Sequence, residues 1–335
     1  MAGKECREIV SERLARKILI ENINERDENQ LLQVLSKYAG SIAVVSLNRR
    51  AVTAAKSLGM RVLFIDSLTW LWNEIPKEYL LSDRYYYYNI FGAGEKLAGV
   101  KNAVPIPIIT EELPATAGSR SNVKLLYVGG ISNPLVSGIS ESYLKIFGTA
   151  LQSASRDLEV VVTGDSSVVD FLSRYAKYPE GVSLKTMKRD EFAEALAVSE
   201  RLVTTPGSTA TFESFALGTP TAFLLPANLS QWRQLRHFTA ELMAPSKMEW
   251  ETYSDIGSYE LEKRDEKEAI IVIREIADGL LNDENSLRRI SQDMDGLLCG
   301  AIDPAPQKEF IEKIGYNGSS VMVSNILKLL KPSGN

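Results

Sequence analysis

The stretch that decides the fold is Thr204-Thr-Pro-Gly-Ser-Thr-Ala-Thr-Phe-Glu-Ser-Phe-Ala-Leu-Gly-Thr-Pro220, continued by Thr221-Ala-Phe-Leu-Leu-Pro-Ala-Asn-Leu-Ser-Gln231. An apolar strand ends at the turn pair Pro206-Gly207, and Ser208 or Thr209 can cap the helix that follows. Gly218 then ends that helix, as glycine often does. A second buried strand and a second loop complete a strand–loop–helix–strand–loop unit, which is typical of an α/β fold.

This unit has the residues that a nucleotide sugar needs. Free backbone N–H groups and the helix dipole favour an anion at a helix start, so Gly207 to Thr209 are predicted to hold a phosphate. Glu213, further along the helix, suits a pair of ribose hydroxyls as a hydrogen-bond acceptor. Ser230 and Gln231, after the next strand, carry neutral donors and acceptors suited to a hexose. The order of these residues along the chain predicts one site with contacts to a diphosphate, a ribose and a hexose.

The same residues resemble the donor-site signature of GT-B glycosyltransferases, chiefly the UDP-glycosyltransferase and MurG-like groups. The matching elements are Pro206-Gly-Ser-Thr-x-Thr-x-Glu213, Gly218-x-Pro220 and Pro226-x4-Gln231. The resemblance implies that the glycine loop holds the diphosphate, that the glutamate binds the ribose and that the glutamine meets the donor sugar. Two positions depart from the UDP-glycosyltransferase pattern, which has His in place of Thr205 and Asp in place of Ser230. An ordinary strand–turn–helix of a parallel sheet is the alternative interpretation.

Length and composition set the class of protein. A chain of 335 residues is long enough for two domains, and 44% hydrophobic with 24% charged residues is typical of a globular protein. The net charge of −5 gives no electrostatic reason to expect nucleic acid as a partner. No apolar run approaches the roughly 20 residues of a membrane span. Two cysteines are too few for a disulfide framework, so we expect a cytoplasmic protein.

The alternation of strands and helices predicts two Rossmann-like domains. The clearest linker is the small, polar stretch from Glu111 to Asn122. We therefore place an acceptor-side domain at residues 1–117 and a donor-binding domain at residues 118–335. The last helix, from about Ser319 to Leu330, is expected to cross back to the first domain, as the final helix of GT-B proteins does.

The N-terminal domain is predicted to be small. Helices are expected at 6–20, 30–38 and 50–58, and strands at 42–45, 61–65, 85–90 and 103–106. On a strand, the side chains of Tyr85 to Tyr88 alternate between faces, so two can point to the core and two to a cleft or solvent; packing is the favoured interpretation. Chains of the GT-B family that this sequence resembles usually begin with a strand and a glycine loop that faces the acceptor. Either that unit lies outside this sequence or the protein dispenses with it.

The C-terminal domain opens on Val123-Lys-Leu-Leu-Tyr-Val-Gly-Gly-Ile-Ser-Asn-Pro134, in which a buried strand runs into two glycines. Glycines at such a point let the backbone approach a ligand, so Gly129, Gly130 and Asn133 are predicted donor contacts. A simple tight turn is the alternative. Further strands at 158–162, 182–186, 201–204 and 222–225 predict a doubly wound sheet with ligands at its carboxyl edge.

The catalytic groups are harder to assign. The helix start at Gly207 can stabilise a departing diphosphate, so no metal or other cofactor is required. The single histidine, His237, lies about 240° around its helix from Gln231 and is disfavoured as a base. Asp66 follows a buried strand and is the candidate base, with Asn48 and Trp70 as acceptor contacts. Alternatively, Asp66 caps the next helix and Trp70 belongs to the core.

The sequence therefore predicts a metal-independent inverting glycosyltransferase that moves a hexosyl group from a UDP-sugar to a small-molecule or lipid-linked acceptor. The elements Asp66-Ser-Leu-x-Trp-x-Trp and Gly129-Gly-x-x-Asn-Pro together are similar to natural-product glycosyltransferases such as cytosylglucuronate synthases. Two alternatives remain, a UDP-sugar 2-epimerase and a non-catalytic GT-B-like subunit of a partner transferase. Each of these three functions is compatible with assembly of the chain with a partner subunit or as a homodimer.

Overall fold

The computed structural model divides into two compact units. It describes residues 27–110, 112–114, 119–132, 135–136, 140–153, 157–255 and 261–330. Unit 1 combines the chain up to Ile108 with the stretch that begins at Gly318, and unit 2 spans Ile109–Asn317. The predicted boundary between residues 117 and 118, the helix expected at 6–20 and Asn133 lie outside the described residues.

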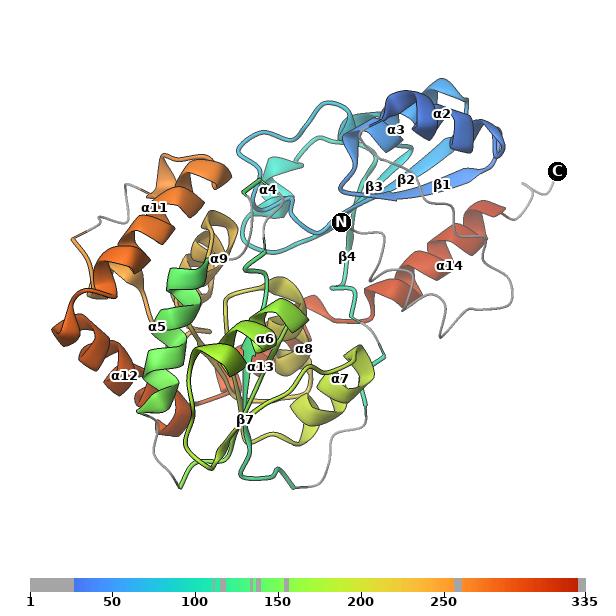
Figure 1. Cartoon of the computed structure of the whole chain (residues 1–335). Helices are drawn as coiled ribbons and strands as arrows, with labels where there is room; N and C mark the ends of the chain where they lie inside the picture. Colours follow the sequence, from blue (N-terminus) through green and yellow to red (C-terminus); the bar gives the residue numbers. More distant parts are fainter. Residues whose placement is uncertain are drawn as a thin grey trace. The chain divides into compact units, whose positions relative to one another are not determined.

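Unit 1 is built on a parallel sheet with the strand order β1-β2-β3-β4. Its strands are β1 (Ile42–Ser46), β2 (Arg61–Asp66), β3 (Arg84–Tyr88) and β4 (Ala103–Ile106). Its helices are α2 (Glu28–Ser36), α3 (Arg49–Ser57), α4 (Ala93–Lys96) and α14 (Gly318–Leu330), with a single turn of 3-10 helix at Tyr79–Leu81. Figure 1 shows α2 and α3 side by side, close to β1 and β2. All four strands expected in this region are present.

The tyrosine run on β3 is buried. Tyr85, Tyr86, Tyr87 and Tyr88 are between 0% and 8% exposed, so packing, the favoured interpretation of this run, is confirmed and none of the four faces solvent. The physical reason is the position of β3, which pairs with β2 on one side and β4 on the other. A central parallel strand is covered on both faces, and its residues are buried whichever way they point.

Unit 2 contains a parallel sheet of five strands with the order β7-β6-β5-β8-β9. The strands are β5 (Lys124–Val128), β6 (Val160–Gly164), β7 (Val182–Leu184), β8 (Arg201–Thr204) and β9 (Thr221–Phe223). The helices are α5 (Glu141–Gln152), α6 (Ser166–Tyr175), α7 (Arg189–Val198), α8 (Ser208–Ala216), α9 (Leu229–Ala240), α11 (Glu266–Leu280), α12 (Glu284–Cys299) and α13 (Ala305–Ile314), with a 3-10 turn at Trp250–Thr252. The predicted doubly wound α/β architecture is confirmed.

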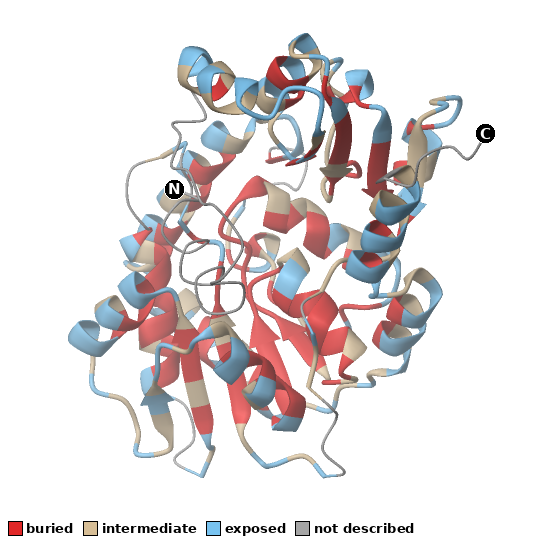
Figure 2. Ribbon diagram, turned by 90° about the vertical axis from the view of Figure 1, so that its right-hand side faces the viewer, coloured by how far each residue is buried: buried red, intermediate tan, exposed pale blue. Residues whose placement is uncertain are grey.

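Both faces of the unit 2 sheet are covered by helices. Leu126 on β5 packs into a large apolar cluster that includes residues of α5, α11 and α12. Its neighbour Leu125 points to the other face and packs with Phe192 and Leu196 of α7 and Leu217 at the end of α8. Most residues of β5 and β6 and all residues of β8 and β9 are buried, which gives the largely red sheet of Figure 2, whereas the edge strand β7 has no buried residue. Burial on both faces explains why these strands read as unbroken apolar runs rather than alternating ones.

The strand order creates a switch point between β5 and β8. From β5 the chain proceeds through β6 and β7 to one edge of the sheet, and it returns through β8 and β9 to the other edge. In open α/β sheets, a crevice opens outside the carboxyl ends of the strands where the winding reverses. The described sheet of unit 1 runs in one direction without such a reversal. By this rule, the ends of β5 and β8 in unit 2 are the expected place for a ligand.

Among the described residues, we find no helix with the length and apolar character that crossing a membrane requires.

Candidate functional site

Three loops meet at the switch point of unit 2 and are tied together by buried hydrogen bonds. The hydroxyl of Thr205, directly after β8, donates to the carbonyl of Gly129 after β5 at 2.7 Å and accepts from its N–H at 3.1 Å. Gln231 and Asn228, in the loop after β9 and the start of α9, donate to Gly129 and Gly130 carbonyls at 2.9 to 3.3 Å. The structure therefore brings together the glycine pair and the two loops of the central motif.

Gly130 requires glycine for two reasons. Its φ of +64° lies in the left-handed region, and a Cβ at this position would lie 2.8 Å from Nε2 of Gln231. Gly129 is similarly restricted, because its Cβ would overlap the ring of Tyr127. These contacts show close approach of backbone and side chains around the loop, which is more than a simple tight turn requires. The predicted ligand contacts of Gly129 and Gly130 stay predictions.

Gln231 has a structural role in this arrangement. Its Oε1 accepts from the N–H of Ala227 at 2.8 Å, its Nε2 donates to the glycine carbonyls, and the residue is 5% exposed. Ser230 is also engaged, because its hydroxyl donates to Asn228 and its N–H donates to Glu266. Burial raises the pKa of Glu266, although the hydrogen bond from Ser230 opposes the shift. This geometry favours scaffolding over the predicted sugar contacts of both residues.

The start of α8 has no side-chain cap. Gly207 offers no side chain that could accept its first N–H groups, a feature that α8 shares with α4, α6, α7 and α13, whereas the N-cap side chains of α2, α3, α5, α9 and α12 accept such groups. Ser208 is half-buried and Thr209 is exposed, so the first turn of α8 reaches solvent. Nε2 of Gln234 donates to the Ser208 hydroxyl at 3.3 Å and orients it. Uncapped amides at a helix start favour an anion there.

Glu213 lies inside α8 with one carboxylate oxygen still available. Its Oε1 accepts a hydrogen bond from Nη2 of Arg189 at the start of α7. Its Oε2 is buried and has no hydrogen-bond partner among the described residues. The side chain is only 1% exposed. Buried carboxylate oxygens are normally hydrogen-bonded, so Oε2 of Glu213 is a candidate contact for a ligand hydroxyl.

In unit 1, Asp66 is fully enclosed. Its Oδ1 accepts from the N–H of Leu68 at 2.7 Å, and its Oδ2 accepts from Nε1 of Trp72 at 2.9 Å and from the hydroxyl of Tyr85. Burial and the Asp66 charge raise the pKa of Tyr85, so its hydroxyl stays protonated as a donor. Asp66 is 0% exposed and Trp70 is 4% exposed. This geometry favours structural roles for both over the predicted base and acceptor contact, which stay predictions.

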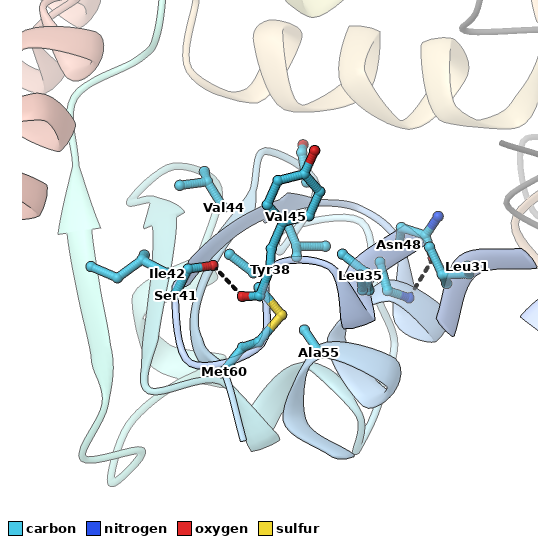
Figure 3. A pocket seen from close by; sticks show the side chains of 13 residues that line it. Leu31, Leu35, Tyr38, Ser41, Ile42, Val44, Val45, Asn48, Ala55 and Met60 are labelled. Atoms are coloured by element: carbon cyan, nitrogen blue, oxygen red, sulfur yellow. Dashed lines mark hydrogen bonds between the residues drawn. The ribbon is translucent and has the colours of Figure 1, made fainter. Parts of the chain in front are cut away.

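Asn48, the other predicted acceptor contact, lines a cavity in unit 1. Its side chain caps α3 by accepting from the N–H of Ala51 at 3.0 Å. The cavity, of about 430 Å³, lies along the edge strand β1 between α2 and α3 (Figure 3). Its walls are mostly apolar: Leu31, Leu35 and Tyr38 from α2 and its end, Ile42 to Val45 from β1, Ala51 and Ala55 from α3, and Met60. Cavities of this volume and lining suit small apolar molecules.

Sequence reasoning missed four residues of the site, namely Thr205, Asn228, Gln234 and Arg189. Asn228 carries a usable signal, since Asn before a helix is a typical N-cap. Gln234 follows Gln231 by three positions and therefore shares its helix face. No local pattern identifies the pairing of Arg189 with Glu213, because it depends on how α7 packs against α8.

No protein-family model matches this chain, and no curated protein matches it in sequence. Solved structures are similar to it. The UDP-GlcNAc 2-epimerase from Neisseria meningitidis bound to UDP-GlcNAc is 13% identical with a TM-score of 0.54, over 97% of this chain and 90% of that one. A UDP-glucosyltransferase from Polygonum tinctorium is 14% identical with a TM-score of 0.50, over 88% and 89%. MnaA from S. aureus, in a co-structure with UDP, is 13% identical with a TM-score of 0.50, over 98% and 89%.

These similarities establish the fold. The chain has the GT-B fold of two Rossmann-like units, as the resemblance of its central motif implied. Glycosyltransferases and epimerases both occur among the similar structures, so the fold is common to two kinds of activity. The residues of the site must therefore carry any argument about function.

Proposed function

We propose that this chain is a metal-independent glycosyltransferase that binds a UDP-sugar in unit 2 and transfers its hexosyl group, with inversion, to a small apolar or lipid-linked acceptor. The observation that carries the proposal is the open start of α8 at the switch point, with the buried Glu213 farther along the same helix. Backbone amides there suit a diphosphate, and a carboxylate suits the adjoining ribose.

In the proposed reaction, an acceptor oxygen attacks the anomeric carbon of the donor sugar, the bond from that carbon to the diphosphate breaks, and UDP leaves. Negative charge grows on the diphosphate as the bond breaks. The N–H groups of Gly207, Ser208 and Thr209 would stabilise that charge, and the dipole of α8 would add to the effect. Gly129 and Gly130 would line the opposite side of the diphosphate. The acceptor proton must pass to a base, for which Asp66 is the sequence-based prediction.

An aspartate at the start of α8 tests the diphosphate site because it acts on stability and on binding in opposite directions. We expect Thr209→Asp to raise the free energy of unfolding by about 0.5 kcal/mol, since a negative charge suits a helix start. The same charge should weaken UDP binding about tenfold through repulsion of the diphosphate. Thermal denaturation and isothermal titration calorimetry with UDP measure the two effects.

Thr209→Asn is the matched control, because it is neutral and similar in shape to the aspartate. It should bind UDP as the original protein does. Unchanged UDP affinity in Thr209→Asp would place the diphosphate elsewhere and refute the proposed site.

A 2-epimerase is the second candidate, favoured by the similarity to UDP-GlcNAc 2-epimerase structures. The two activities differ in their products. A transferase releases UDP from a UDP-sugar in the presence of an acceptor, whereas an epimerase changes the configuration at C2 without one. Incubation with UDP-glucose and with UDP-GlcNAc, each with and without a panel of small apolar alcohols as acceptors, followed by chromatography and proton NMR of the products, distinguishes them. Binding of UDP without either product would support the non-catalytic subunit.

The cavity beside Asn48 is proposed as the acceptor site. Ala51→Phe would fill it from α3, so binding of anilinonaphthalene sulfonate, an anionic dye that fluoresces on apolar surfaces, should weaken roughly fivefold. Thr53→Phe on the exposed side of the same helix is the matched control and should leave probe binding unchanged. UDP affinity should be the same in both variants, because the diphosphate site lies in the other unit. Equal probe binding by the two variants would exclude this cavity as an apolar site.

A further inference from the structure

Thr205 is the first residue after β8, and the proposed function gives it no role. Its hydroxyl donates to the carbonyl of Gly129 at 2.7 Å and accepts from the N–H of the same residue at 3.1 Å. The residue is 3% exposed. A hydroxyl has one hydrogen to donate, and that of Thr205 is given to Gly129, so it is not available to a phosphate. Any effect of Thr205 on a phosphate must therefore pass through the glycine loop.

The carbonyls of Gly129 and Gly130 point to the same side of this loop. Nε2 of Gln231 donates to both of them, at 3.1 and 3.3 Å. The Gly129 carbonyl also accepts from Thr205, and the Gly130 carbonyl also accepts from Asn228 at 2.9 Å. Each oxygen thus has two donors, one for each of its lone pairs. Side chains that follow β8 and β9 therefore fix the orientation of two successive peptide groups.

The N–H groups of those two peptide groups point the other way. In a trans peptide, the C=O of one residue and the N–H of the next point in opposite directions. The N–H groups of Gly130 and Ile131 are thus directed away from the three side chains that hold the carbonyls, and neither has an acceptor among the described residues. Gly130 is exposed and its φ is +64°. Successive N–H groups beside a left-handed residue form a concavity that suits an anion.

We propose that Thr205 is a positioning residue for the diphosphate, because its hold on Gly129 keeps the N–H groups of Gly130 and Ile131 turned toward the ligand as donors. This inference rests on the proposed nucleotide-sugar site. Without the hydroxyl, Gly129 loses one hydrogen bond on its N–H and one on its carbonyl. Two glycines in sequence have a wide choice of backbone conformations, so the loop can then turn its amides elsewhere. The loss falls on the phosphates of the ligand and spares its nucleoside.

UDP and uridine test this, because they differ only in the diphosphate. Thr205→Val removes the hydroxyl and keeps the shape of the side chain. We expect it to weaken UDP binding about tenfold in isothermal titration calorimetry, since hydrogen bonds to a charged group contribute roughly ten- to a hundredfold. Binding of uridine, followed by NMR titration, should not change. Thr205→Ser keeps the hydroxyl and should bind UDP within about threefold of the original protein.

Thr219→Val is the matched control for lost stability. Thr219 is 1% exposed, and its hydroxyl also makes two bonds, donating to the carbonyl of Leu196 at 2.9 Å and accepting from Nη1 of Arg120 at 2.9 Å. It precedes β9, whereas Thr205 follows the parallel strand β8, so the two threonines lie at opposite edges of the sheet. Thr219→Val should lower the melting temperature about as much as Thr205→Val and leave the affinities for UDP and uridine unchanged.

A second measurement needs no variant and decides the matter if Thr205→Val does not fold. When UDP is added to the original protein, the amide proton resonances of Gly130 and Ile131 should move downfield, because their N–H groups donate to a phosphate. Uridine should leave both resonances in place.

Three results would overturn the inference and leave the proposed function intact. They are original UDP affinity in Thr205→Val, a loss in Thr205→Ser or Thr219→Val as large as that in Thr205→Val, and amide resonances of Gly130 and Ile131 that do not respond to bound UDP. Failure of the original protein to bind UDP is a different result, since it removes the proposed function and this inference with it.

Discussion

Asp66→Ala is expected to lower the free energy of unfolding of unit 1 by about 4 kcal/mol, because it leaves several buried donors without an acceptor. These donors are the N–H of Leu68, Nε1 of Trp72 and the hydroxyl of Tyr85. Each unsatisfied buried donor costs about 1 to 3 kcal/mol, partly recovered where the chain relaxes. Chemical denaturation followed by tryptophan fluorescence measures the change, since Trp70 and Trp72 lie in the affected segment. Glu74→Ala, at an exposed carboxylate of the same unit, is the control and should change stability little.

A second substitution of Asp66 distinguishes a structural role of this residue from a catalytic one. Asp66→Asn keeps the shape of the side chain and should retain more folded protein than the alanine variant. If Asp66 is only structural, the transfer rate per folded molecule should stay within a few-fold of the original. A loss of a hundredfold or more in correctly folded Asp66→Asn would instead support the predicted base, whose contribution is typically of that size.

Gln231→Leu is expected to destabilise unit 2 by about 3 kcal/mol, because a residue of similar shape replaces one that closes three buried hydrogen bonds. The N–H of Ala227 loses its acceptor, and the carbonyls of Gly129 and Gly130 each lose one of two donors, because Thr205 still donates to Gly129 and Asn228 to Gly130. Differential scanning calorimetry measures the loss. Gln152→Leu, at an exposed glutamine at the end of α5, is the matched control.

The alternative for Gln231 is the sugar contact predicted from the sequence. In that case the melting temperature of Gln231→Leu would match that of the control. Binding of UDP-glucose would then weaken relative to binding of UDP, because only the sugar would lose a hydrogen bond. An unchanged melting temperature together with that loss would contradict the structural role assigned here.

Much of the fold is predictable because local signals and tertiary structure agree. The helix of the central motif lies between a glycine start and a glycine end, and the observed α8 spans Ser208–Ala216 within those limits. Strands Ala103–Ile106 and Arg201–Thr204 have the predicted bounds. Alternating strands and helices predict a doubly wound sheet, and strand ends in such a sheet meet at one edge. The proximity of Gly129 and Gly207 loops followed from this rule.

The remaining features depend on how elements pack. Packing is the favoured interpretation of Tyr85 to Tyr88, but that all four are buried follows only from the central position of the strand, both faces of which are covered. An amide such as that of Gln231 can bind a sugar or a backbone carbonyl equally well, and only the position of the glycine loop decides between them. The contact between Arg189 and Glu213 joins two helices whose packing the sequence does not specify. These features therefore depend on one thing that the sequence does not specify, which is long-range geometry.

Unit 1 is discontinuous in sequence, and this determines when it can finish folding during synthesis. Its chain leaves after Ile108 and returns at Gly318, where the N–H of Gly318 donates to the Ile108 carbonyl at 3.0 Å. The returning α14 packs against β4, and the carbonyl of Leu329 accepts from Arg61 at 3.3 Å. The ribosome must therefore synthesise all of unit 2 before unit 1 can acquire α14, its last helix. Unit 2, uninterrupted in sequence, can mature first, and its compactness brings the separated ends together and reduces the entropy lost in closing that long loop.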